Sequence, residues 1–130
     1  MPEIIKRYFD AFNAKNYEGM LDCLTPDIAH HVNEGGVRVG KEAFAAFCAH
    51  MDRCYDERLT DIVVFSSDTP DRAAAEFVVN GTYKATDDGL PPASGQTYVL
   101  PAGTFFTLRD GLICRLTTRY NLADWTAQVQ

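Results

Sequence analysis

Residues 96–121 read QTYVLPAGTFFTLRDGLICRLTTRYN, a run of strand-forming residues broken once by turn chemistry. Val, Thr, Phe and Tyr dominate it, and these residue types favour strands. The tripeptide Arg109-Asp110-Gly111 between them has the composition of a tight turn. The pattern therefore predicts a hairpin of two strands, residues 96–108 and 112–121.

Two further strands are predicted upstream, residues 58–66 and 72–85, joined by the compact turn at residues 68–71. The segment that follows, Thr86 to Ser94, contains Asp87-Asp88-Gly89 and Pro91-Pro92 and has no strand or helix pattern. Loops of this length inside a small domain are often functional. We expect a mobile loop that forms the rim or lid of a site.

The N-terminal half predicts two helices that form a hairpin. The first begins behind Pro2 and should stop between Asn13 and Asn16; the second, capped by Asn16, should run through Leu24 and be ended by Pro26. The apolar residues of the first helix recur at helical spacing: Ile4, Ile5, Tyr8, Phe9 and Phe12.

Between Asp27 and Val39 the pattern changes to period two around Asn33-Glu34-Gly35-Gly36, which predicts two short strands. Gly40 precedes a third helix, and residues 122–129 add a terminal helical turn. The third helix carries one apolar stripe: Phe44, Phe47, Cys48, Met51 and Tyr55.

Taken together, the elements predict a single α+β domain over residues 1–130, in which a strongly curved, mostly antiparallel sheet wraps around about three N-terminal and central helices. Three small residues in the predicted strands, Gly81, Ala102 and Gly103, lack the bulk to fill a conical interior. We therefore expect a blind pocket for a small hydrophobic molecule.

The composition and charge of the chain limit the classes of molecule that it can bind. The chain has 130 residues and a formal net charge of −6 without any basic run, which excludes a nucleic-acid backbone and an anionic membrane as partners. No long apolar segment is present, so we expect a cytoplasmic protein. Its four cysteines form no C-x-x-C pair and are expected to be reduced core thiols.

Four local landmarks carry a resemblance that spans nearly the whole chain: residues 7–14 (RYFDAFNA), 26–28 (PDI), 40–44 (GKEAF) and 110–113 (DGLI). Together they resemble the ketosteroid isomerase and SnoaL-like polyketide cyclase branch of the NTF2-like superfamily, which has a cystatin-like conical fold. The resemblance implies a homodimer. It leaves open an isomerase activity, a cyclase/lyase-like activity and a protein that is not an enzyme.

The resemblance also tests the chemistry position by position. Ketosteroid isomerases combine a carboxylate base with a tyrosine and a protonated carboxylic acid that stabilise the oxyanion. Tyr8 matches the tyrosine, and Gly103 matches the second acid. Val32 matches the base, or Asn33 does if the register slips by one, and neither accepts a proton at neutral pH. Standard steroid isomerisation is therefore not expected, and Asn121 at the acid/base position of SnoaL-like cyclases argues against their mechanism as well.

His30 is the remaining proton-transfer candidate, because strand alternation places it on the same face as Val32. A dry wall would keep its imidazole neutral and basic enough to accept a proton. The alternatives are a core histidine and a core tyrosine at Tyr8. The predicted substrate-binding residues are Phe12, Val32, Asn33, Phe47, Met51, Phe77, Val79, Ala102, Gly103, Thr118 and Tyr120.

The sequence predicts neither a metal nor a cofactor. His31 and His50 with Asp27 or Asp52 do not form a convincing set of metal ligands, and no Gly-rich phosphate loop occurs. The leading interpretation is an enzyme that moves a proton on an apolar, carbonyl-bearing substrate, with His30 as carrier and Tyr8 as donor. The alternative is a noncatalytic ligand-binding or dimerisation module.

Overall fold

The computed structural model describes residues 3–130, so the predicted first-turn position of Pro2 lies outside the described residues. Within these residues four helices and six strands follow one another: α1 (Glu3–Asn13), α2 (Tyr17–Asp22), β1 (Leu24–Val32), β2 (Arg38–Val39), α3 (Lys41–Cys54), β3 (Tyr55–Ser66), β4 (Arg72–Tyr83), β5 (Thr97–Arg109), β6 (Leu112–Tyr120) and α4 (Leu122–Val129).

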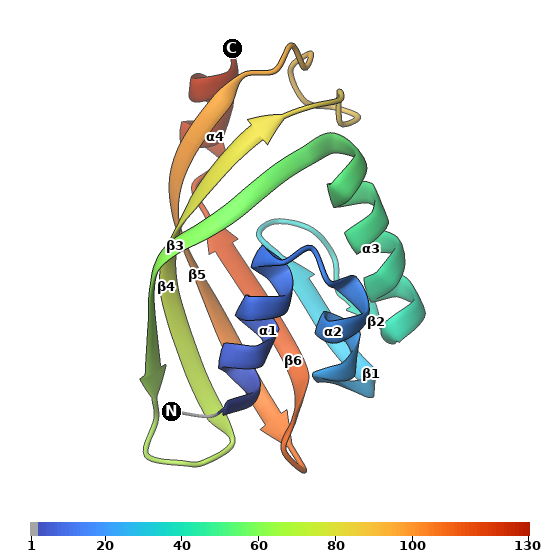
Figure 1. Cartoon of the computed structure of the whole chain (residues 1–130), viewed down its shortest axis with the longest axis vertical. Helices are drawn as coiled ribbons and strands as arrows, with labels where there is room; N and C mark the ends of the chain where they lie inside the picture. Colours follow the sequence, from blue (N-terminus) through green and yellow to red (C-terminus); the bar gives the residue numbers. More distant parts are fainter. Residues whose placement is uncertain (1–2) are drawn as a thin grey trace.

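The strands form one sheet in the order β2-β1-β6-β5-β4-β3. All neighbours are antiparallel except β1 and β6, which are parallel. In Figure 1 the long strands form a bent wall, α1 lies in front of it, and α3 lies at the right, beyond α1 and α2. The predicted α+β architecture is confirmed.

The curvature of the sheet has a local cause. The β3–β4 register shifts between Thr60 and Val63, and Asp61 within that interval has a φ of 54°. An extra residue at such a bulge bends the strand and increases its twist. The long strands therefore curl toward the helices and leave a concave inner face.

The second helix ends earlier than predicted. Asn16 does cap it, accepting a hydrogen bond from the Gly19 amide at 3.0 Å. The helix stops at Asp22, however, and Leu24 and Pro26 belong to β1. Pro26 is tolerated there because this part of β1 lies in the interval where its register with β6 shifts.

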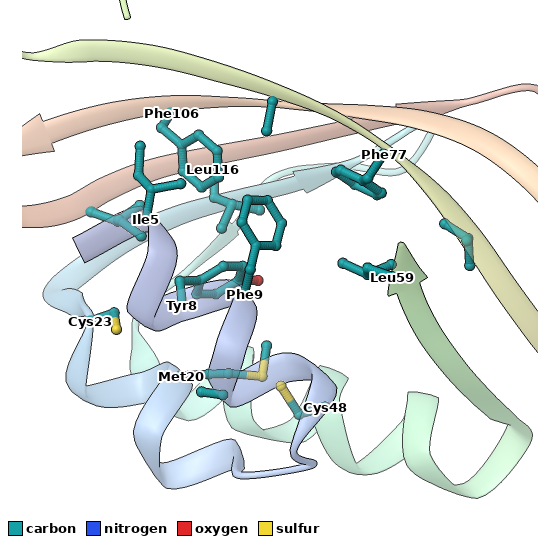
Figure 2. Close-up of a cluster of buried hydrophobic side chains, with 14 of the residues drawn as sticks. Ile5, Tyr8, Phe9, Met20, Cys23, Cys48, Leu59, Phe77, Phe106 and Leu116 are labelled. Atoms are coloured by element: carbon teal, nitrogen blue, oxygen red, sulfur yellow. The ribbon is translucent and has the colours of Figure 1, made fainter. Parts of the chain in front are cut away.

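The core fills the space between α1 and the sheet (Figure 2). Phe9 packs edge-on against Phe77 and Phe106, with ring centroids 5.5 and 5.9 Å apart. Leu116 and Ile5, both fully buried, lie in the same cluster. This packing holds α1 against the inner face of the sheet and so fixes the position of its polar residues.

Three of the four cysteines are buried, and all four are free thiols, as the sequence predicts. Within residues 3–130 no helix combines the length and the apolar character that crossing a bilayer would require.

Candidate functional site

A cavity of about 400 Å³ lies between the concave face of the sheet and the helices. Helices α1, α2, α3 and α4 and strands β1 to β6 all contribute to its wall, and most of the lining side chains are apolar. A volume of this size accommodates a small organic molecule. The cavity is therefore the natural candidate site.

Most of the residues predicted from the sequence stand on this wall. Tyr8 and His30 line the cavity, as do Phe12, Val32, Phe47, Met51, Phe77, Val79, Ala102, Thr118 and Tyr120. Their contact with a substrate stays a prediction.

Asn33 and Gly103 do not line the cavity, which corrects their predicted placement. Asn33 follows β1 with a φ of 52°, and its side-chain oxygen accepts a hydrogen bond from the Tyr120 amide at 3.1 Å. Gly103 faces away because alternate residues of β5 point inward. Thr104 takes the inner position, with its hydroxyl 3.2 Å from that of Thr118.

Gly81 also differs from the expectation, because it leaves no empty volume. A Cβ at this position would lie 2.2 Å from Cζ of Tyr98. Glu57, Gly81 and Tyr98 are aligned across β3, β4 and β5. The missing side chain of Gly81 thus lets the Tyr98 phenol cross β4 and donate to the Glu57 carboxylate at 2.5 Å.

Tyr8 is 6% exposed and packs edge-on against Phe9 and Phe106. Burial raises the pKa of its phenol. The hydroxyl therefore keeps its proton at neutral pH and can donate a hydrogen bond.

His30 is 3% exposed, and its ring centroid lies 4.7 Å from those of both Phe44 and Phe47. Burial, and secondarily the charges of Arg38 and His31, lower the pKa of His30 to about 4. The lowered pKa keeps the imidazole of His30 neutral, as the sequence predicts. It does not leave His30 basic enough to act as the predicted proton acceptor, since a base with so low a pKa holds a proton poorly at neutral pH.

Glu57 is a cavity residue that the sequence analysis missed. Burial raises the pKa of its carboxyl, outweighing the Tyr98 hydrogen bond and the Lys15 charge, which both lower it. A carboxyl in such surroundings is suited to proton transfer. The only signal in the sequence was its position between Tyr55 and Leu59, which places all three on the inner face of β3.

The loop after β4 is held in place rather than left free over the cavity. Asp87 accepts hydrogen bonds from Tyr55 at 2.7 Å and from His50 at 2.9 Å, and the Asp87 amide donates to the Tyr83 hydroxyl at 2.9 Å. Asp87 and Leu90 line the cavity. The predicted rim is therefore part of the wall.

His50, Cys54 and Asp87 form a cluster whose ligand atoms all lie within 4.8 Å of one another, so they could hold a metal ion. His50 and Cys54 are four residues apart on α3, and the loop supplies the distant third group. A guanidinium nitrogen of Arg53 lies 3.0 Å from Nδ1 of His50, however. The positive charge of Arg53 beside His50 opposes the binding of a cation at this cluster.

The SnoaL-like domain model matches residues 5–116 of the sequence. The chain belongs to the SnoaL-like domain family. Among curated proteins no match is found.

Solved structures give the same assignment and define the fold. This SnoaL-like chain superposes with a TM-score of 0.97 on a "putative polyketide cyclase" of Silicibacter sp. TM1040, at 66% identity over 98% of this chain and 93% of that one. A second protein of that name, from Pseudomonas putida KT2440, is 51% identical, with a TM-score of 0.97 over 99% of this chain and 97% of that one.

An NTF2-like protein of unknown function from Burkholderia pseudomallei K96243 shares 15% identity, with a TM-score of 0.80 over 98% of this chain and 95% of that one. The fold of this SnoaL-like protein is therefore NTF2-like. Within it, Asn121 caps α4 by accepting a hydrogen bond from the Asp124 amide at 3.0 Å. That contact gives this asparagine a structural role at the position where the cyclase resemblance implied an acid/base group.

Proposed function

We propose that this SnoaL-like protein is an enzyme that removes a proton beside the carbonyl of an apolar substrate held in the cavity. One observation carries the proposal: Glu57, a carboxyl with a raised pKa, lines the same mostly apolar cavity as the protonated phenol of Tyr8. Such a reaction needs a base and a donor to the developing oxygen charge. Both groups are present on the wall.

In the proposed step the carboxylate of Glu57 takes the proton from the carbon next to the carbonyl. The C–H bonding pair becomes the new C=C bond of an enolate, and the negative charge moves to the carbonyl oxygen. The Tyr8 hydroxyl donates a hydrogen bond to that oxygen. Tyr98 orients the Glu57 carboxylate through its 2.5 Å hydrogen bond.

The proposal moves the role of proton carrier from His30 to Glu57. Their environments push the two pKa values in opposite directions: the pKa of His30 falls to about 4 and that of Glu57 rises. The raised pKa makes the Glu57 carboxylate the better base near neutrality. His30, in turn, is suited to binding rather than to proton transfer.

The names of the relatives support the same reaction class. Two proteins at 51% and 66% identity are called putative polyketide cyclases. Ring closure between two carbonyl groups of one chain begins with removal of a proton beside a carbonyl. We therefore propose a polyketide-like carbonyl compound as the substrate class.

The test uses 2-tetralone, an apolar ketone small enough for the cavity, in D2O. Trp125, the one tryptophan of the chain, lines the cavity, so quenching of its fluorescence reports binding. Loss of the α-proton signal in the NMR spectrum reports proton exchange. The wild type should accelerate exchange by about 10²-fold or more over buffer.

The variant E57Q should lose this acceleration and still bind 2-tetralone. E76Q is the matched control, because Glu76 is exposed on β4 and does not line the cavity. Exchange in E57Q at the wild-type rate, or bound ketone that exchanges no faster than in buffer, would contradict the proposal.

An apolar outer surface favours the second candidate, a homodimer formed through the sheet. Phe65, Ala74 and Phe105 lie in one row across β3, β4 and β5, and Phe65 and Phe105 are 49% and 50% exposed. An exposed apolar row on a monomer marks an interaction surface. We propose that two copies bury these rows against each other, with or without catalysis in the cavity.

Light scattering on the eluted protein tests the dimer. The wild type should have twice the chain mass, and F105D should have the mass of one chain. T69D adds the same charge at the exposed β3–β4 turn and should remain dimeric. A monomeric wild type, or a dimeric F105D, would exclude this interface.

A further inference from the structure

Three buried side-chain polar atoms have no hydrogen-bond partner within residues 3–130: Oγ1 of Thr25 and Nδ1 of His30 on β1, and Nη1 of Arg38 on β2. Of the three residues, His30 and Arg38 line the cavity and Thr25 does not. His30 and Arg38 are directly opposite each other in the β1–β2 register, so their side chains share one face. Because burying an unpaired polar group is costly, this pair is suited to an acceptor on a bound molecule.

The guanidinium of Arg38 is fixed by an aromatic ring. Its central carbon lies 4.7 Å from the centroid of Phe47, and the His30 ring lies 4.7 Å from the same centroid. A guanidinium stacked on a ring uses its flat face and keeps the N–H donors at its edge available. The contact therefore orients Arg38 without consuming its hydrogen bonds.

No carboxylate within residues 3–130 forms an ion pair with Arg38. The acidic residues of the cavity are engaged elsewhere: Asp52 accepts from Tyr17, Glu57 from Tyr98 and Asp87 from Tyr55.

Position along α3 separates these charges. Arg38 lies just before the N-terminal end of this helix, whereas Asp52 lies in its last turn and Asp87 contacts His50 there. A helix of 14 residues is about 20 Å long. The cavity thus has a cationic end near His30, without a carboxylate partner, and an end near Tyr55 where Asp52, Glu57 and Asp87 outnumber Lys15.

We propose that the ligand of this cavity carries a carboxylate at one end of an apolar body, and that Arg38 and His30 bind this carboxylate. The edge of a guanidinium matches the two oxygens of a carboxylate, and a neutral imidazole can donate one further N–H. Phe44 and Phe47 then pack against the adjoining apolar part. The inference shares its cavity with the proposed function and requires no proton transfer.

The probes are 2-naphthoate and 2-naphthamide, which share one apolar body and differ in the charge of the head group. Equilibrium dialysis at pH 7.5 measures the affinity of each. The wild type should bind 2-naphthoate at least about tenfold more tightly than 2-naphthamide, the range of a charge-assisted hydrogen bond.

The variants R38M and R38Q should lose this preference while keeping the wild-type affinity for 2-naphthamide, which also shows that the cavity is intact. R115Q is the matched control, because Arg115 is exposed and lies on the outer face of the sheet. It should leave both affinities unchanged.

Equal affinity of the wild type for the two probes would overturn the proposal, as would an R38M or R38Q variant that keeps the preference. Failure of the wild type to bind either probe would also overturn it. Tight, Arg38-dependent binding of 2-naphthoate by a protein that exchanges no α-proton of 2-tetralone would contradict the proposed function alone.

Discussion

Lowering the pH should destabilise this protein through His30. The pKa of this residue is about 4 in the folded chain, against an ordinary value of 6.5. Between these values the unfolded chain binds a proton that the folded chain does not, so stability falls as the pH falls. The stability that depends on a neutral His30 is fully present above pH 6.5 and is lost progressively toward pH 4.

The magnitude follows from the two pKa values. The two pKa values differ by 2.5, which at about 1.4 kcal/mol for each tenfold step gives about 3 to 4 kcal/mol in all, and about 3 kcal/mol of it is lost by pH 4. Because the side chain is 3% exposed, solvent screens little of this effect. A change of this size is a large part of the stability of a small domain.

Urea unfolding of the wild type and H30Q at several pH values measures this loss of stability. The substitution itself shifts stability at pH 7, so the informative quantity is the difference between pH 7 and pH 4 for each protein. The wild type should lose about 3 kcal/mol more than H30Q over this interval.

The raised pKa of Glu57 makes stability rise as the pH falls, which is the opposite trend. This effect is present in both the wild type and H30Q, so it cancels when their losses are compared. H31Q removes the neighbouring imidazole on the other face of β1, whose charge is the smallest of the three causes of the lowered pKa of His30, and should keep most of the wild-type loss. The same loss in H30Q and in the wild type would refute the reasoning that burial holds His30 neutral.

Three substitutions test the packing. G81A should destabilise the fold by about 1–3 kcal/mol in urea unfolding, because the new Cβ meets the Tyr98 ring at 2.2 Å. In the Y98A background the same substitution should cost less, and additive losses in the double variant would show that the two side chains do not collide. L116A should cost about 2–5 kcal/mol through the cavity it leaves in the core, and a cost below about 1 kcal/mol would mean that the site is not tightly packed. N121A should cost about 1 kcal/mol by removing the cap of α4, with N121D, which can still accept from Asp124, as the variant that keeps it; equal melting temperatures of N121A and the wild type would contradict a capping role.

Local patterns in the sequence were enough for most of the fold. The apolar stripe of α3 and the strand signal of residues 96–121 arise from spacing along one element, and the turn at Arg109-Asp110-Gly111 arises from its own residues. Period 3.6 and period 2 need no knowledge of distant contacts. The end of α2 was misplaced because Pro26 stops a helix in isolation but is also accommodated in β1.

The chemistry of the cavity depended on contacts between distant residues. Glu57 became a half-buried, hydrogen-bonded acid only because the β3–β4–β5 register aligns it with Gly81 and Tyr98. The Gly81 position, which indicated empty space when taken alone, is filled by a ring from the next strand. The position of a residue along a strand indicates which face of the sheet it occupies, but not which residues of other strands lie beside it.

The sequence by itself determined an α+β chain with one face of its sheet covered by helices, because hydrophobic periodicity depends only on the spacing of apolar residues along each element. Only the tertiary structure decided which polar groups meet inside. It places Arg38 opposite His30, lowers the pKa of that imidazole and ties Asp87 to Tyr55. The physical reason is that burial, charge and hydrogen-bonding partners are properties of the assembled neighbours, which lie up to tens of residues apart in the chain.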